Sequence, residues 1–116
     1  MARTTITSVA ITDTGYNLTD SAGFTTLSTG AGNGVAFSQS GSDRIFLKND
    51  TGGAAVFTVK VPTPSGYTAL GLTIPDMTIT VANGKSWVLE PHSLFRQSDG
   101  AIYIDCDVAG KVLVLA

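Results

Sequence analysis

The residues that could act as catalysts are few, and most lie in the last third of the chain. The only histidine is His92, in the segment Glu90-Pro91-His92-Ser93. A serine hydrolase needs a histidine base that is oriented by a carboxylate and lies within reach of a serine hydroxyl. The nearby residues of suitable type are Ser93, Ser98, Asp99 and Asp105. Closeness in sequence does not provide the geometry, so we interpret His92 as a loop residue that hydrogen-bonds locally, and we expect no enzymatic activity.

Residues that could bind a metal are also sparse. A zinc site takes several Cys or His ligands, and the chain has one of each, Cys106 and His92. Asp105 and Asp107 would project from one face of a strand and could join Asp99 around Ca²⁺, but no segment follows the calcium-loop pattern. We therefore expect no metal and no cofactor. Cys106 alternates with Ile102 and Ile104 and is predicted to pack as a small apolar side chain.

Two further groups of residues could hold a ligand. The segment Gly30-Ala31-Gly32-Asn33-Gly34 has the composition of a phosphate-binding loop, but no helix is expected to follow it. Four aromatic residues could make a platform for a sugar ring, namely Tyr67, Trp87, Phe95 and Tyr103. Trp87 is better explained as a core residue, so a carbohydrate-binding β-sandwich remains an alternative.

The elements that must position these side chains are β-strands. Short runs rich in Thr, Val, Ile and aromatic residues are separated by Gly and Pro residues. The spacing of these Gly and Pro residues is typical of a β-sandwich or barrel. We predict an all-β fold, a single antiparallel β-sandwich or jelly-roll-like domain built from hairpins with an extended N-terminal segment. Residues 41–116 are expected to form the β-sandwich, and residues 1–40 an N-terminal strand and a flexible Thr/Ser/Gly-rich segment that could act as an arm. The segment 61–76 is expected to be a long connection across one end of the sandwich.

Three hairpins are predicted, each with a three-residue loop that ends in glycine. In the first hairpin, which turns at Gly52, the expected cross-strand pairs are Ile45–Phe57 and Leu47–Ala55. In the second, which turns at Gly84, they are Ile79–Trp87 and Met77–Leu89. In the third, which turns at Gly110, they are Cys106–Val112 and Ile104–Val114. Burial of Trp87 selects the second register, because a one-residue slip moves every side chain to the other face. The third hairpin has a second face that either a loop of the same domain or another subunit covers, with Tyr103, Leu113 and Leu115 beside Asp105, Asp107 and Lys111.

The charge content points to an assembly component. Charged residues make up 14% of the 116 residues, against about 25% in a typical globular domain. Such a surface is either rich in Thr and Ser or covered by copies of the chain or by a larger partner. The seven basic residues are scattered, which argues against nucleic-acid binding, and the apolar runs are too short to span a membrane.

The amino-terminal strand, expected over 4–11, can pair within the domain or with a neighbour's exposed sheet edge. It and the second face of the third hairpin supply the candidate interface residues: Thr4, Thr5, Ile6, Thr7, Val9, Tyr103, Leu113 and Leu115.

Several motifs are shared with a known group of viral proteins. They are Ile45-Phe46-Leu47-Lys48-Asn49, Gly71-Leu72, Asp76-x-Thr78-Ile79-Thr80-Val81, Gly84, and Pro91-x-Ser93-Leu94-Phe95-x-Gln97-x-Asp99-Gly100-x-Ile102-Tyr103-Ile104-Asp105. In this order they resemble capsid decoration, or cement, proteins of tailed bacteriophages, which are usually encoded beside the major capsid protein. The resemblance covers residues 43–116; the first forty residues do not match.

The resemblance implies a structural virion protein, made in the host cytoplasm, that binds the outer surface of the capsid and stabilises the shell by bridging capsomers. The implied partners are the major capsid protein and further copies of the chain, in trimers or less commonly dimers. No catalytic residue is carried over. A tail or head-fibre module is the alternative within the virion.

Overall fold

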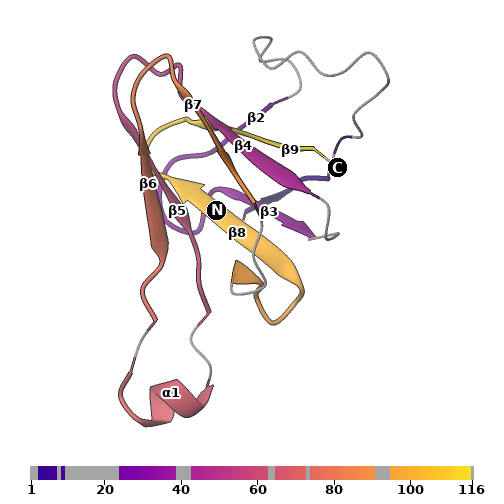
Figure 1. Cartoon of the computed structure of the whole chain (residues 1–116), viewed down its shortest axis with the longest axis vertical. Coiled ribbons are helices and arrows are strands. Elements are labelled where there is room, and N and C mark those ends of the chain that lie inside the picture. The colour runs from indigo at the N-terminus through magenta and orange to yellow at the C-terminus, as the bar shows by residue number, and fades with distance from the viewer. Residues whose placement is uncertain are drawn as a thin grey trace.

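Two β-sheets face each other across one apolar core in the computed structural model (Figure 1), which describes residues 3–7, 9, 24–38, 43–62, 65–72, 74–90 and 95–115. Sheet A has the strand order β1 (Thr4–Thr5), β3 (Val35–Ser38), β8 (Ala101–Cys106), β5 (Ala55–Val59) and β6 (Met77–Val81). Sheet B has the order β2 (Thr25–Thr26), β9 (Lys111–Leu115), β4 (Arg44–Lys48) and β7 (Ser86–Leu89). Only β1 and β3 pair in parallel among these strands. The predicted all-β sandwich is confirmed.

The core follows from the alternation of apolar residues along each strand. In β5, Ala55, Phe57 and Val59 are buried while the residues between them are partly exposed. Because successive side chains of a strand point to opposite faces, this pattern aims one face of each sheet at the other. The fully buried large side chains are Phe37, Phe57, Ile45, Leu47, Ile102, Ile104, Leu113, Val35, Val59, Val81, Val112 and Val114.

The three predicted hairpins are wrong, because each turn carries the chain from one sheet to the other. β4 lies in sheet B and β5 in sheet A, β6 in A and β7 in B, and β8 in A and β9 in B. Ile45 therefore pairs with Leu89 and Val114, and Phe57 pairs with Ile79 and Cys106. The inward faces of both sheets look into the same core, so an alternating pattern identifies buried residues but not the sheet they belong to.

Trp87, the residue that selected the second register, is not a core residue. It pairs with the buried Leu47 and so shares its face, but β7 is the outermost strand of sheet B and the Trp87 side chain is 50% exposed. The glycine that ends this turn sits at a bulge, as is typical of such glycines, but the bulge lies opposite β4 and not within a β6–β7 hairpin. The Gly84 N–H donates to the Asn49 carbonyl (2.7 Å) and the Asn49 N–H donates to the Lys85 carbonyl (3.1 Å), which makes a bulge opposite β4.

The amino-terminal segment crosses between the sheets. β1 pairs with β3 in sheet A, and the Ile6 N–H donates to the Ala36 carbonyl (2.9 Å). Val9 then bridges in parallel to Leu115 in sheet B, where its N–H donates to the Val114 carbonyl (2.7 Å). The described part of this segment thus pairs within its own chain, whereas residues 8 and 10–11 of the expected strand lie outside the described residues. β2 and β3 place further parts of residues 1–40 in the two sheets.

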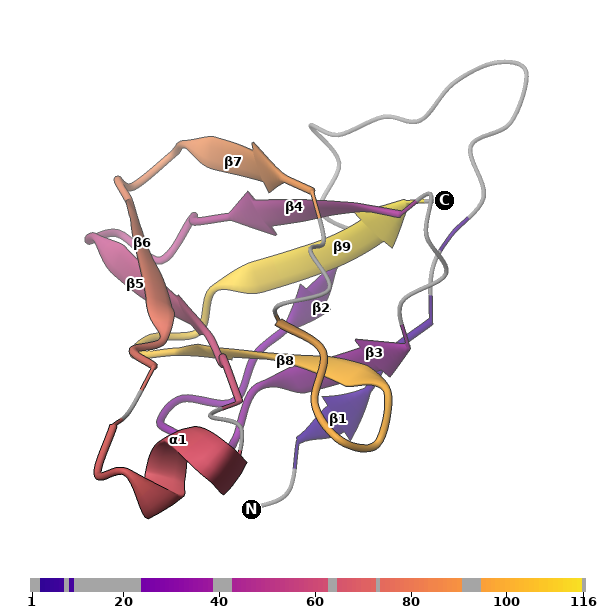
Figure 2. The ribbon, with the colours of Figure 1, turned by 60° about the horizontal axis from the view of Figure 1, so that its bottom comes forward.

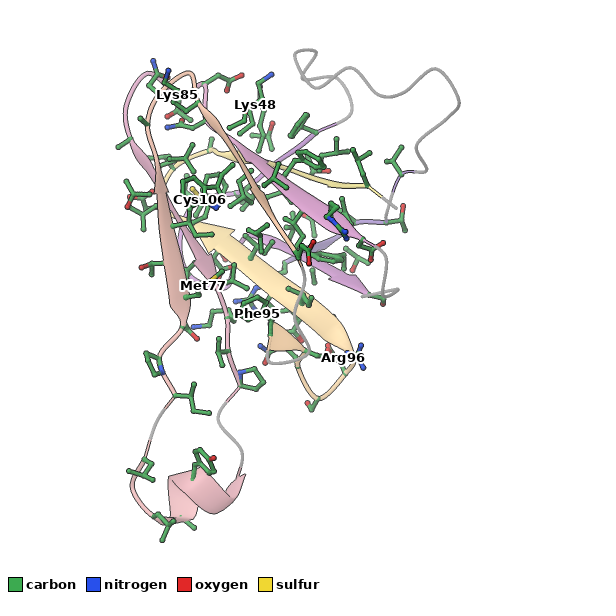
Figure 3. All side chains as sticks on the ribbon, viewed as in Figure 1. Lys48, Met77, Lys85, Phe95, Arg96 and Cys106 are labelled. Atoms are coloured by element: carbon green, nitrogen blue, oxygen red, sulfur yellow. The ribbon has the colours of Figure 1, made fainter. Side chains whose placement is uncertain are left out.

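The connection between β5 and β6 projects away from the sandwich instead of crossing its end (Figures 1 and 2). We call the described residues of this connection, 60–62, 65–72 and 74–76, the finger. The short helix α1 (Ser65–Ala69) lies at its tip, and Lys60 and Asp76 at its base form an ion pair of 2.6 Å. The turn between β6 and β7, where Lys85 lies, is at the opposite end of the molecule (Figure 3). No helix in the described part of the chain is long and apolar enough to span a membrane.

Candidate interaction surfaces

The residues with catalytic potential are not assembled into a site in the described part of the chain. His92 and Ser93 lie outside the described residues. The Asp99 carboxylate accepts hydrogen bonds from the Tyr103 hydroxyl (2.5 Å) and the Ala101 N–H (3.0 Å), both in its own turn and the strand that follows. Asp105 is engaged by Arg3. Each carboxylate thus has a structural partner within the described residues.

The proposed calcium ligands are likewise separated by their partners. Asp105 binds Arg3, and the Asp107 carboxylate accepts the Val56 N–H (2.9 Å). No group of three possible metal-ligating side chains gathers anywhere in the described ranges. Cys106 is 2% exposed and packs in the core as predicted, and burial raises the pKa of its thiol. Figure 3 shows Cys106 among the side chains that fill the space between the sheets.

Arg3, Asp105 and the glycine-rich loop (residues 30–34) are joined by a cluster of hydrogen bonds that we call the latch. The Asp105 carboxylate accepts bonds from Arg3 Nε (2.9 Å) and Nη2 (2.6 Å), and from the N–H groups of Gly32 (2.9 Å) and Gly34 (3.1 Å). Burial alone would raise the pKa of Asp105, but these bonds outweigh it and the pKa is lowered. The Arg3 guanidinium also lies 4.4 Å from the centre of the Tyr103 ring. The glycine-rich loop therefore binds a carboxylate of its own chain.

The structure separates the candidate interface residues into exposed and buried sets. Thr4, Thr5 and Thr7 are exposed, and Val9 is 36% exposed. The remaining candidates are buried to different degrees: Ile6 is partly buried against the core, Tyr103 is partly exposed, and Leu113 and Leu115 are 2% and 3% exposed. This chain itself covers both leucines, so they present no free surface to a partner.

The finger carries an exposed apolar surface that sequence reasoning missed. Tyr67, Leu70 and Leu72 are 48%, 76% and 54% exposed, and no residue from 61 to 75 is charged. The two sides of the finger are joined at its base, because Asp76 binds both Lys60 and the Val61 N–H (2.8 Å). The Lys60 N–H donates to the Tyr103 carbonyl of β8 (3.0 Å), which fixes the base to the sandwich. The signal that could have found this surface is the long uncharged stretch between Lys60 and Asp76.

A second exposed apolar surface lies on β7, at the edge of sheet B. Trp87 and Val88 are 50% and 54% exposed, and they point to opposite faces of the sheet. Because Trp87 was expected in the core, the sequence interpretation also missed this surface.

The four aromatic residues proposed as a sugar platform do not form one surface. Tyr67 is on the finger, Trp87 on β7, Phe95 is 9% exposed in the core, and Tyr103 lies under Arg3 on β8. A cavity of about 470 Å³ opens beside Tyr103 at the base of the finger. The charged groups that line it are already paired, Arg3 with Asp105 and Lys60 with Asp76.

A comparison of the chain with protein-family models, with curated proteins and with solved structures finds no match.

Proposed function

We propose that the protein is a structural subunit that binds the outer surface of a tailed-phage capsid and bridges capsomers. The observation that supports a binding role is the finger, which carries Tyr67, Leu70 and Leu72 exposed on an uncharged segment. Exposed apolar surface of this kind marks sites of protein–protein contact. The Lys60–Asp76 ion pair holds the two sides of the finger together at its base, and the tip projects away from the sheets.

The resemblance over residues 43–116 supports the choice of partner, because it is to decoration proteins that bind the shell formed by the major capsid protein. A protein that binds only the assembled shell stabilises it by mass action, in proportion to the logarithm of its free concentration over the dissociation constant. In this mechanism the tip of the finger enters an apolar recess of a capsomer, and another part of the same domain contacts the neighbouring capsomer or a second copy of the chain.

The proposal can be tested with expanded empty capsids assembled from the major capsid protein encoded beside this chain. We expect the protein to sediment with these capsids and to raise their melting temperature. The double variant Leu70→Ser/Leu72→Ser should bind at least about tenfold more weakly, because each buried leucine contributes about 1.5–3 kcal/mol. Its own thermal unfolding should be unchanged, since both side chains are exposed.

Ala54→Ser, a change at an exposed turn residue, is the matched control and should bind like the unmodified chain. If the protein neither sediments with the capsids nor changes their melting, the proposed function is wrong. If it binds and the leucine variant binds equally well, the finger is not the contact.

A further inference from the structure

The outer edge of β7 is a long, uncharged strand edge without a pairing strand among the described residues. Among the described strands, β7 pairs with β4 alone, on one side. Of the other outermost strands, β1 and β2 have two residues each and β6 has five, whereas β7 has four, Ser86-Trp87-Val88-Leu89; neither β6 nor β7 contains a charge, and β7 has a basic and an acidic residue next to its two ends. Proteins normally protect such an edge with charges, proline or a covering segment, because it is a template for another strand.

The direction of the main-chain groups shows which residues of β7 are available for pairing. The Asn49 N–H donates to the Lys85 carbonyl, while the Lys85 N–H donates to the Ala82 carbonyl within the turn. The Lys85 carbonyl, and by alternation the main-chain groups of Trp87 and Leu89, thus point toward β4. The groups of Ser86 and Val88 therefore point away from β4, and those of Glu90 follow the same alternation. These are the donors and acceptors that an added strand would meet.

The charges at the two ends of β7 favour one partner and one direction. Lys85 precedes the strand and Glu90 follows it, and both are exposed; within its own chain Glu90 makes a surface ion pair with Arg44 of β4 (3.2 Å). If a second copy of β7 lies antiparallel to the first, Glu90 of each copy lies near Lys85 of the other. Opposite charges then meet at both ends of the paired strands. A parallel approach would place like charges together, which destabilises neighbouring strands.

We propose that a second copy of this chain adds to sheet B through β7, antiparallel and around a two-fold axis at Val88. Val88 then lies opposite Val88 of the partner subunit, and Trp87 lies opposite Leu89 of the partner subunit. The outward main-chain groups of Ser86 and Val88 bond across the axis. The two-fold axis is perpendicular to the sheet, so the core-facing side of sheet B is the same in both copies. A one-residue slip would pair Trp87 with residues that point to the other face, so that register is excluded.

This inference does not depend on the proposed function, because it concerns only contacts between copies of the chain. It selects a dimer over the trimer that the resemblance implies, since an isologous contact around a two-fold axis joins two copies. The dimer leaves the finger free, because β7 and the finger lie on different parts of the molecule (Figures 1 and 2).

The test is sedimentation equilibrium of the full chain over a series of concentrations. We expect a monomer–dimer equilibrium that Val88→Lys weakens at least about tenfold, because it replaces two buried valines by two opposed cations. Val88→Thr, which keeps the branched shape, should still dimerise. Both variants should melt like the unmodified chain when monomeric, because Val88 is exposed there. A chain that stays monomeric at every concentration, or that forms trimers, overturns the proposal.

Charge reversal separates self-pairing from any other association. Glu90→Lys and Lys85→Glu each give β7 the same charge at both ends, and each should weaken dimerisation by about two- to tenfold. The double variant Lys85→Glu/Glu90→Lys restores opposite ends and should recover the dimer. Dimerisation that is unaffected by Val88→Lys, or a double variant that dimerises more weakly than both single variants, shows that the copies associate elsewhere.

Discussion

At the scale of single residues, Asp105 joins three segments that are distant in the sequence: β8, the glycine-rich loop and the amino-terminal Arg3. Its carboxylate binds Arg3, 102 positions earlier in the chain, and the N–H groups of Gly32 and Gly34. The alternation of residues predicted that Asp105 shares a face with Asp107. It did not predict Arg3 as the partner, because an ion pair over such a distance depends on the fold that brings β1 beside β3.

Removal of the latch arginine should lower the stability of the fold. Arg3→Ala leaves the buried Asp105 carboxylate with only the two glycine N–H groups, so we expect the free energy of unfolding to fall by about 1–3 kcal/mol. Urea denaturation followed by circular dichroism measures this change. Arg44→Ala is the control, because the Arg44–Glu90 pair is exposed on both sides and should contribute less than about 1 kcal/mol. Equal losses in the two variants would contradict the structural role of the latch.

The latch also makes the stability depend on pH. The pKa of Asp105 is lowered in the folded state, because the bonds from Arg3 and the glycine loop outweigh the effect of burial. A carboxyl group of this kind stabilises the fold fully above its unfolded pKa of about 3.9, and this stabilisation is lost as the pH falls through the folded pKa. We therefore expect the free energy of unfolding to decrease as the pH drops below about 4.

Urea titrations at neutral pH and at a series of acidic values check this expectation. The decrease should be shallower in Arg3→Ala but not absent, since the pKa of Asp76 is also lowered: the bonds from Lys60 and Val61 outweigh its burial. A fold that becomes more stable in acid would disagree with this assignment.

At the scale of elements, the sequence predicted the strands and their inward faces well, and it predicted their partners poorly. Ile45, Leu47, Phe57 and Ile104 are all buried as expected. The pairing failed because a glycine turn between two strands can close a hairpin or carry the chain over to the other sheet, and both give the same alternation. Burial of Trp87 was the deciding argument and failed because the edge position of β7 is a property of strand order.

The glycine-rich loop gives a prediction about close packing. A Cβ added at Gly34 would lie 1.9 Å from the Ile104 carbonyl oxygen, a backbone atom that cannot move aside. We expect Gly34→Ala to lower the free energy of unfolding by about 2–4 kcal/mol. Gly53→Ala is the control, since nothing lies within 4 Å of its added Cβ, and its effect should stay within about 1 kcal/mol. Thermal melts of both variants decide the matter, and similar melting temperatures would show that the loop adjusts.

At the scale of the whole molecule, the exposed surfaces could not be predicted from the sequence. The absence of charge from 61 to 75 is compatible with a buried connection and equally with a segment that projects into solvent. Only the antiparallel pairing of β5 with β6 forces the chain between them out of the sandwich. The fold class, by contrast, could be predicted, because it depends on the residue composition and on the spacing of Gly and Pro between apolar runs, both of which the sequence shows directly.

The topology also predicts slow folding with a late closing step. β3 and β5 both pair with β8, far along the chain, and all-β domains with such distant pairings fold in about milliseconds to seconds. The Arg3–Asp105 contact joins residues that are 102 positions apart, so we expect it to form after the main barrier. Arg3→Ala should then accelerate unfolding and leave refolding nearly unchanged. Stopped-flow circular dichroism measures both rates, and a variant that mainly refolds more slowly would place the contact in the folding nucleus.

The parallel bridge between Val9 and Leu115 determines how the molecule carries a pulling force. When the two ends of the chain are pulled apart, Val9 is drawn backward along its direction and β9 forward along the same line. The hydrogen bond from the Val9 N–H to the Val114 carbonyl (2.7 Å) lies across that line, so the pulling force shears it. We therefore expect a high rupture force when the molecule is pulled by its two termini. Pulling by two points that peel β7 away from β4 should need a lower force. A subunit under tension through its ends would resist most where Val9 meets its last strand, β9.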